Sequence, residues 1–90
     1  MIYNLYCIRD SVSGVYDSPF VMSTNESAIR SFKCEYDRAL VSAPSSPFAM
    51  FVSDYDLYLL GEFNADSGDI IGAPPTLVYS GRSLIQPDVK

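Results

Sequence analysis

A strand, a tight turn and the start of a return strand occupy residues 54–70, and this stretch constrains the fold more than any other. Side chains between positions 56 and 63 alternate with the period of two that a β-strand has. One face carries Leu57, Leu59 and Phe63, and the other carries Tyr58, Leu60 and Glu62. Asn, Asp and Gly occur at positions 64–68, where Gly adopts positive φ and Asn and Asp bond their own backbone. The stretch therefore predicts a β-hairpin.

A second hairpin is predicted at residues 2–21. Residues 2–9 are mostly apolar on both faces, which is typical of a central strand that is covered on both sides. Gly14 completes the turn that follows. Residues 15–21 return, but Pro19 interrupts them, and a proline inside a strand indicates an edge position. We therefore expect the returning arm to be irregular.

One amphipathic helix is predicted at residues 24–40. Ser23 followed three residues later by Glu26 forms a capping box, and Asn25 is a competing cap. At a helical spacing the side chains divide into two faces. The apolar face carries Ala28, Ile29, Phe32, Tyr36, Ala39 and Leu40, and the polar face carries Glu26, Arg30, Lys33, Asp37 and Arg38.

Residues 41–53 connect this helix to the hairpin at residues 54–70. Pro44 and Pro47 prevent the helix from continuing, because proline lacks the backbone donor that a helix interior needs. The apolar residues 48–52 are expected to lie against the core.

These elements predict an α+β domain in the order ββαββ, a small antiparallel sheet of about four strands with one amphipathic helix on one face. The fourth strand is expected at residues 69–72 and ends at the Gly-Ala-Pro-Pro sequence of residues 72–75. Residues 76–79 could pair briefly or form a turn of helix. The domain is expected to span residues 1–82, and residues 83–90 are expected to form a C-terminal tail.

Charge limits the classes of function that the chain can have. Its net charge is −5, and its six basic residues are spread along the sequence. A protein that binds nucleic acid by neutralising phosphates has a basic face, so this balance argues against tight, non-specific binding by a monomer. No apolar stretch approaches the roughly 18 residues of a membrane helix. The two cysteines, Cys7 and Cys34, are expected to be free thiols of a cytoplasmic protein.

Catalysis is not expected from these residues. The chain has no histidine, which excludes His-based triads and His-metal sites. Asp54 and Asp56 would share one face of a strand and could hold Mg²⁺, but a two-metal site needs more ligands, so a solvated pair is the favoured interpretation. We expect no enzymatic activity, no metal, no cofactor and no small-molecule substrate.

Two groups of side chains are candidates for binding. The nucleic-acid candidates are Arg9, Arg30, Lys33 and Arg38. Seven tyrosines could add the stacking that single-strand binders use. From the residues alone, however, a solvated polar face is the favoured interpretation of the helix charges, because Glu26 and Asp37 are interleaved with them. The candidates for a dimer or partner interface are Tyr6, Ile8, Tyr58 and Leu60, which are expected on the sheet face turned away from the helix. We expect a homodimer there, unless residues 41–53 or the C-terminal segment cover this face.

Three patterns along the chain together resemble the small nonstructural protein of gokushoviruses, which are tailless single-stranded DNA phages of the microvirus group. The matching residues are Tyr6, Arg9, Asp10, Ser13 and Gly14; Asn25, Glu26, Ala28, Ile29, Arg30 and Phe32; and residues 54–63 with Ser67 and Gly68. The resemblance covers residues 2–82, and it depends on the order and spacing of these patterns.

The resemblance implies a non-capsid protein that acts in the cytoplasm of the infected bacterium. It implies help in the synthesis or packaging of the single-stranded genome, through single-stranded DNA or through phage replication or capsid proteins. The alternative is a protein-interaction factor, a homodimeric adaptor or modulator of a phage or host protein, with no direct contact to DNA.

Overall fold

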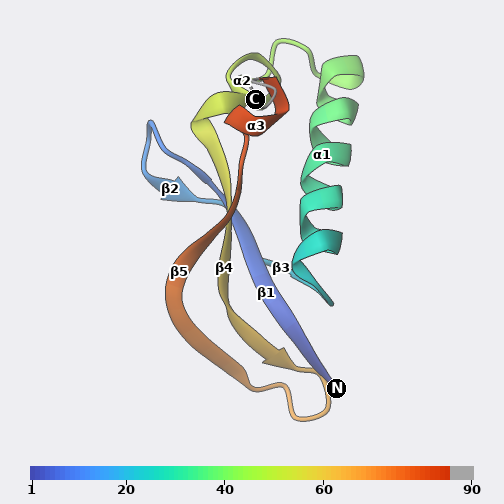
Figure 1. Ribbon diagram of the computed structural model, residues 1–90, viewed down its shortest axis with the longest axis vertical. Coiled ribbons are helices and arrows are strands. Elements are labelled where there is room, and N and C mark those ends of the chain that lie inside the picture. Colours follow the sequence, from blue (N-terminus) through green and yellow to red (C-terminus); the bar gives the residue numbers. More distant parts are fainter. Residues whose placement is uncertain (86–90) are drawn as a thin grey trace, which may run out of the picture.

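The computed structural model describes residues 1–85, and Figure 1 shows one long helix beside a twisted sheet. In chain order the elements are β1 (Ile2–Asp10), β2 (Val15–Tyr16), β3 (Phe20–Met22), α1 (Asn25–Ser42), α2 (Pro47–Met50), the 3₁₀ helix η1 (Val52–Asp54), β4 (Tyr55–Asn64), β5 (Ile70–Ser80) and α3 (Arg82–Ile85). Among these described elements no helix is long and apolar enough to cross a membrane.

The sheet is antiparallel in the order β2-β1-β4-β5. β3 also pairs with β1, on the same edge as β2 but with earlier residues of β1. This confirms the predicted α+β fold and the central position of β1. It also confirms the irregular returning arm, because Pro19 lies in the gap between β2 and β3. The apolar segment after the linker lies against the core as expected, where the Phe48 ring contacts Phe32 and Tyr55 edge-on.

The predicted end of the fourth strand was wrong. β5 does not stop at Gly72 but pairs with β4 as far as Ser80. Between the pairs Leu59↔Thr76 and Gly61↔Gly72, the three residues 73–75 lie opposite Leu60 alone. The strand continues past its two prolines because β5 is an edge strand, where a missing backbone donor breaks no inner ladder.

The first turn of α1 also differs from the prediction. Thr24 is the N-cap, and its side chain accepts a hydrogen bond from the Ser27 backbone N–H at 3.1 Å. Asn25 is already helical, and its side chain accepts a hydrogen bond from the buried Tyr6 hydroxyl at 2.6 Å. This contact between the sheet and the helix start fixes the helix one residue later than a Ser23 cap would.

The core lies between α1 and one face of the sheet, which we call the inner face. Its fully buried members include Tyr6, Ala28, Phe32, Val52 and Leu57. Tyr6 pairs with Leu59 and Ile8 pairs with Leu57, so both β1 residues point toward the helix. The expectation that Tyr6 and Ile8 face away from the helix was therefore wrong.

A bulge at Leu60 explains this error, because the pair Leu5↔Gly61 is followed by Tyr6↔Leu59 and not by a pair between Tyr6 and Leu60. Odd-numbered residues of β4 up to Leu59 face the helix, but from Gly61 onward they face the other side of the sheet. Phe63, which pairs with Tyr3, therefore does not face the helix. Because strand alternation has a period of two, a one-residue shift moves every later side chain to the other face.

At the C-terminal end, the first residues of the predicted tail are ordered. α3 includes Leu84, which packs against the core. Residues 86–90 of that predicted tail lie outside the described part of the chain.

Candidate functional site

The sheet face opposite α1, which we call the outer face, has no helix over it in the described part of the chain (Figure 1). Strand pairing places on it, from β1 outward, Leu5, Cys7 and Arg9, then Tyr16 and Val21, then Asp56, Tyr58 and Leu77. Of the predicted interface residues, Tyr58 belongs to this face, and Leu60 lies in the adjacent bulge.

An arginine and two tyrosines form a cluster on the outer face. Arg9 and Tyr16 are directly opposite across the β1–β2 pair, and the Arg9 Cζ lies 5.4 Å from the centroid of the Tyr16 ring. The Tyr16 and Tyr58 rings meet edge-on, with centroids 5.8 Å apart and planes at 64°. Such edge-to-face contacts and cation–π contacts hold aromatic rings in fixed orientations.

The Arg9 side chain is half-buried beneath the β1–β2 turn. A Cβ added at Gly14 would lie 3.6 Å from its Nη2, so the turn passes close over the guanidinium. The Arg9 Nε is buried and has no hydrogen-bond partner among residues 1–85. The ring of Tyr16 and the turn therefore position this arginine, while its charge remains without an ion pair in the described residues.

The surroundings of this cluster are partly open and mainly apolar, apart from Asp56, which lies opposite Arg9 across the β1–β4 pair. Leu77 is 55% exposed, Val21 is 42% exposed and Tyr16 is 44% exposed. Open apolar and aromatic side chains beside one cation suit two kinds of ligand, an unpaired nucleobase that stacks on a ring or an apolar surface of a partner protein.

The other predicted basic residues do not join Arg9. Arg30, Lys33 and Arg38 lie on α1, across the sheet from the cluster. The Lys33 Nζ lies 5.5 Å from the Tyr79 ring centroid, and Arg38 forms an ion pair with Glu35 at 2.5 Å. The four nucleic-acid candidates thus occupy two separate surfaces.

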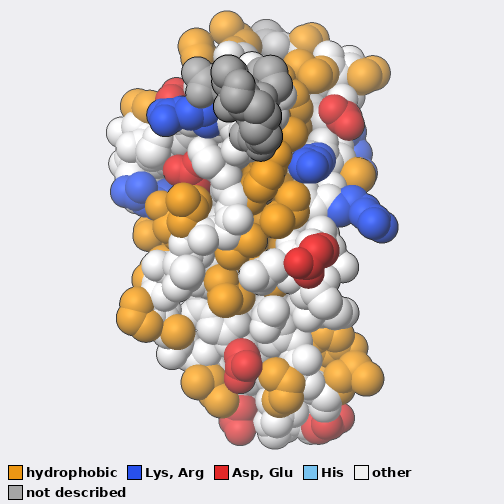
Figure 2. Space-filling view, viewed as in Figure 1, with side chains coloured by type: hydrophobic (Ala, Val, Ile, Leu, Met, Phe, Trp, Pro, Cys, Tyr) orange, Lys and Arg blue, Asp and Glu red, His pale blue; other side chains and the backbone are white. Residues whose placement is uncertain are grey.

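The basic side chains are confined to one part of the molecule in the view of Figure 2. They lie in its upper half together with several acidic side chains, whereas only acidic side chains are seen at its lower end, where the β4–β5 turn lies in Figure 1. A nucleic acid would therefore avoid the β4–β5 end.

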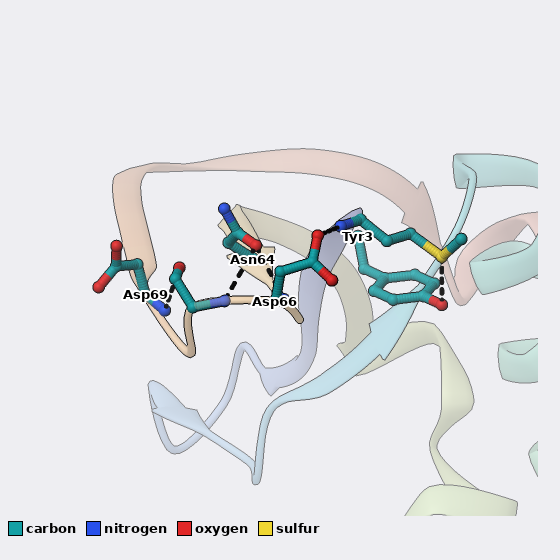
Figure 3. A network of polar contacts seen from close by, with 6 residues as sticks. Tyr3, Asn64, Asp66 and Asp69 are labelled. Carbon is teal, nitrogen blue, oxygen red and sulfur yellow. Dashed lines mark hydrogen bonds and ion pairs between the residues drawn. The ribbon is translucent and has the colours of Figure 1, made fainter.

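Folding accounts for the polar residues of the β4–β5 turn (Figure 3). The Asn64 side chain accepts hydrogen bonds from the backbone N–H groups of Asp66 and Ser67, at 2.9 Å and 3.3 Å, and Gly68 has a φ of 82°. The Asp66 carboxylate also pairs with the N-terminal amine. This confirms the predicted turn chemistry and leaves these side chains without an evident binding role.

Asp54 and Asp56 line a shallow polar pocket of about 580 Å³ together with Arg82. Within residues 1–85 no three His, Cys, Asp or Glu side chains are grouped in a way that could hold a metal ion.

Sequence reasoning missed Tyr16, Val21 and Leu77. The turn at Gly14 contained the signal for Tyr16, because a hairpin through that turn places residue 16 opposite Arg9. Leu77 could not be found in this way, because its strand was expected to end before it.

The comparisons with known proteins identify a family. The model of the family described as Phage ORF5 protein matches residues 3–84. This range includes every strand and helix of the described chain, apart from the first residue of β1 and the last residue of α3. Neither the curated proteins nor the solved structures contain a match. The chain belongs to the Phage ORF5 protein family.

Proposed function

We propose that this phage protein is a non-catalytic, nonstructural factor of a gokushovirus that assists the synthesis or packaging of the single-stranded DNA genome in the host bacterial cytoplasm. Membership of the Phage ORF5 family supports the phage origin. The three sequence patterns that resemble the gokushovirus nonstructural protein support the narrower assignment.

Single-stranded DNA is the ligand that we propose for the outer face. The observation that carries this proposal is the cluster of Arg9, Tyr16 and Tyr58 on an open antiparallel sheet. Proteins that bind single strands stack bases on aromatic side chains, and sheet surfaces with exposed aromatic rings do this for RNA. In our proposal one base stacks against the two tyrosines, and Arg9 contacts the adjoining phosphate.

The charges predict how strong this binding is. One or two phosphate contacts give a slope of log K against log salt of about −0.7 to −1.4, far smaller than that of a basic DNA-binding protein. The net charge of −5 opposes association. We therefore expect weak binding in which stacking contributes more than charge neutralisation.

A fluorescence-anisotropy titration with a labelled single strand of about 15 nucleotides tests this proposal. Raising the salt from about 50 mM to about 200 mM should weaken binding about three- to sevenfold. Tyr58→Leu and Tyr16→Leu should each weaken binding about fivefold or more, because base–aromatic stacking is worth about 1–3 kcal/mol per base.

Arg30→Gln is the matched control, since it removes a positive charge on α1, far from the outer face. It should change the affinity less than twofold or so. If Arg30→Gln weakened binding as much as the tyrosine variants do, DNA would be attracted by general charge. No binding at either salt concentration would reject direct DNA recognition.

Exposed leucine and valine beside the cluster favour a second candidate, a protein-interaction factor that uses the same face. In that case the outer face of one molecule covers the outer face of a second copy, and Leu77 and Val21 are buried in a homodimer. Light scattering at micromolar concentration should give the mass of a dimer, and Leu77→Asp should give the mass of a monomer. A wild-type monomer would reject this homodimer.

A further inference from the structure

A pocket of about 490 Å³ lies on the other side of the β1–β2 hairpin, between that hairpin, α1 and α2. Its volume falls within the range of about 300–1,000 Å³ that is typical of ligand pockets. The walls are mainly apolar and aromatic and include Ile8, Phe48 and Tyr55. Tyr16 of the outer-face cluster also lines this pocket, but neither proposed function uses its other walls.

Three carboxylates line the pocket, and no basic side chain does. Asp10 and Asp17 come from the hairpin, and Glu35 comes from α1 on the opposite wall. The three carboxylates come from two separate parts of the chain, up to 25 positions apart, and the fold brings them to one opening. Like charges that face one apolar cavity repel one another, and a cation between them relieves this repulsion.

Two neighbouring groups respond to this negative charge. Burial raises the pKa of the Tyr55 phenol, and the Asp10, Asp54 and Asp17 carboxylates raise it further. Burial likewise raises the pKa of the Cys7 thiol, with a contribution from Asp17. Burial is the larger cause of both pKa shifts, and the carboxylates act in the same direction because they disfavour the ionisation of a neighbouring acid.

We propose that this pocket receives an arginine or lysine side chain from a basic segment of a partner protein. The aliphatic part of such a side chain fits the apolar walls, and its charged end reaches the carboxylates. The aromatic ring of Phe48 at the lining adds cation–π attraction. The net charge of −5 steers a basic partner toward the molecule.

Arg38 gives the proposal a distinctive signature. It is exposed and pairs with Glu35 at 2.5 Å, so it competes with an incoming cation for one of the three carboxylates. Removing Arg38 should therefore strengthen binding, whereas neutralising Glu35 should weaken it. If the ion pair between Arg38 and Glu35 served stability alone, the loss of either side chain would change the binding affinity in the same direction.

The test is an NMR titration of the intact protein with an uncharged glycine–serine peptide that carries one central arginine, and with the same peptide carrying neutral citrulline. The arginine peptide should shift the amide signals of Ile8, Val15 and Phe48 and bind with a Kd of about 1 mM or tighter. Asp17→Asn and Glu35→Gln should each weaken it about fivefold, and Arg38→Gln should tighten it. The citrulline peptide should not bind.

Asp69→Asn is the control for net charge, because Asp69 lies in the β4–β5 turn at the far end of the molecule. It should leave the affinity unchanged. Equal binding of the citrulline peptide, equal losses in Asp69→Asn and Asp17→Asn, or weaker binding by Arg38→Gln would each overturn the proposal. Shifts that map to the outer face instead of the pocket would overturn it as well.

Discussion

Replacing Gly61 with alanine should remove a large part of the stability of this protein. Gly61 is buried in β4 with a φ of 150°, a backbone conformation that side chains rarely adopt. A Cβ there would lie 2.1 Å from the Ile71 carbonyl oxygen and 3.0 Å from the Gly72 Cα. Because both contacts are with backbone atoms, β5 would have to move away from β4 by about 1 Å to restore ordinary contact.

The size of the effect follows from two costs. A strained backbone conformation costs about 1–3 kcal/mol, and overpacking at a tight contact costs about 1–3 kcal/mol more. We expect Gly61→Ala to lower the free energy of unfolding by about 3–5 kcal/mol, out of the roughly 5–15 kcal/mol that a domain has.

Urea unfolding followed by far-ultraviolet circular dichroism measures this change. The control is Gly72→Ala on the neighbouring strand, where an added Cβ meets nothing within 4 Å, and it should stay within about 0.5 kcal/mol of the wild type. A Gly61→Ala protein within about 1 kcal/mol of the wild type would refute the argument that the two strands approach too closely for a side chain.

Three further predictions concern the helix start, the thiols and one phenol. Thr24→Ala should lower the free energy of unfolding by about 1 kcal/mol in the same urea assay, and Ser23→Ala should leave it nearly unchanged, because Thr24 provides the N-cap hydrogen bond. A thiol reagent should modify the exposed Cys34 rapidly and Cys7 only on unfolding, because Cys7 is buried and its pKa is raised; rapid loss of both thiols in the folded state would contradict this. Burial and nearby carboxylates raise the pKa of Tyr55 above its ordinary value of 10.0, so its contribution to stability is complete below pH 10.0 and is lost as the pH rises through the folded-state pKa. Tyr55→Phe should therefore lose less stability than the wild type between neutral and strongly alkaline pH, and identical pH profiles would contradict this.

Local chemistry was predictable from the sequence where neighbours along the chain decide it. The β4–β5 turn was predicted correctly because Asn64 bonds the backbone two and three residues later. The linker prolines and the amphipathic pattern also located α1 within two residues at its C-terminal end. The N-cap was displaced because the contact between Tyr6 and Asn25 spans 19 positions, beyond what a capping pattern can detect.

The faces of the strands could not be predicted in the same way. A glycine inside a strand, such as Gly61, indicates a bulge or a close approach of two backbones, but the sequence does not state which register a bulge produces. That register decided that Tyr6 and Ile8 belong to the core. Of the candidate site, the sequence predicted Arg9 and Tyr58 as binding residues. Their contact through Tyr16 was not predicted, because it depends on the pairing of β1 with both β2 and β4.

The interrupted course of β5 has a consequence for how copies of this protein meet in a crowded cell. A regular edge strand offers a continuous row of donors and acceptors that can recruit another strand and start a fibre. Here residues 73–75 loop out of register, and Pro74 and Pro75 supply no donor. The edge thus offers only short, misaligned segments to a passing strand. Exposed isoleucines at the start of β5 can therefore be tolerated without turning this edge into a seed for aggregation.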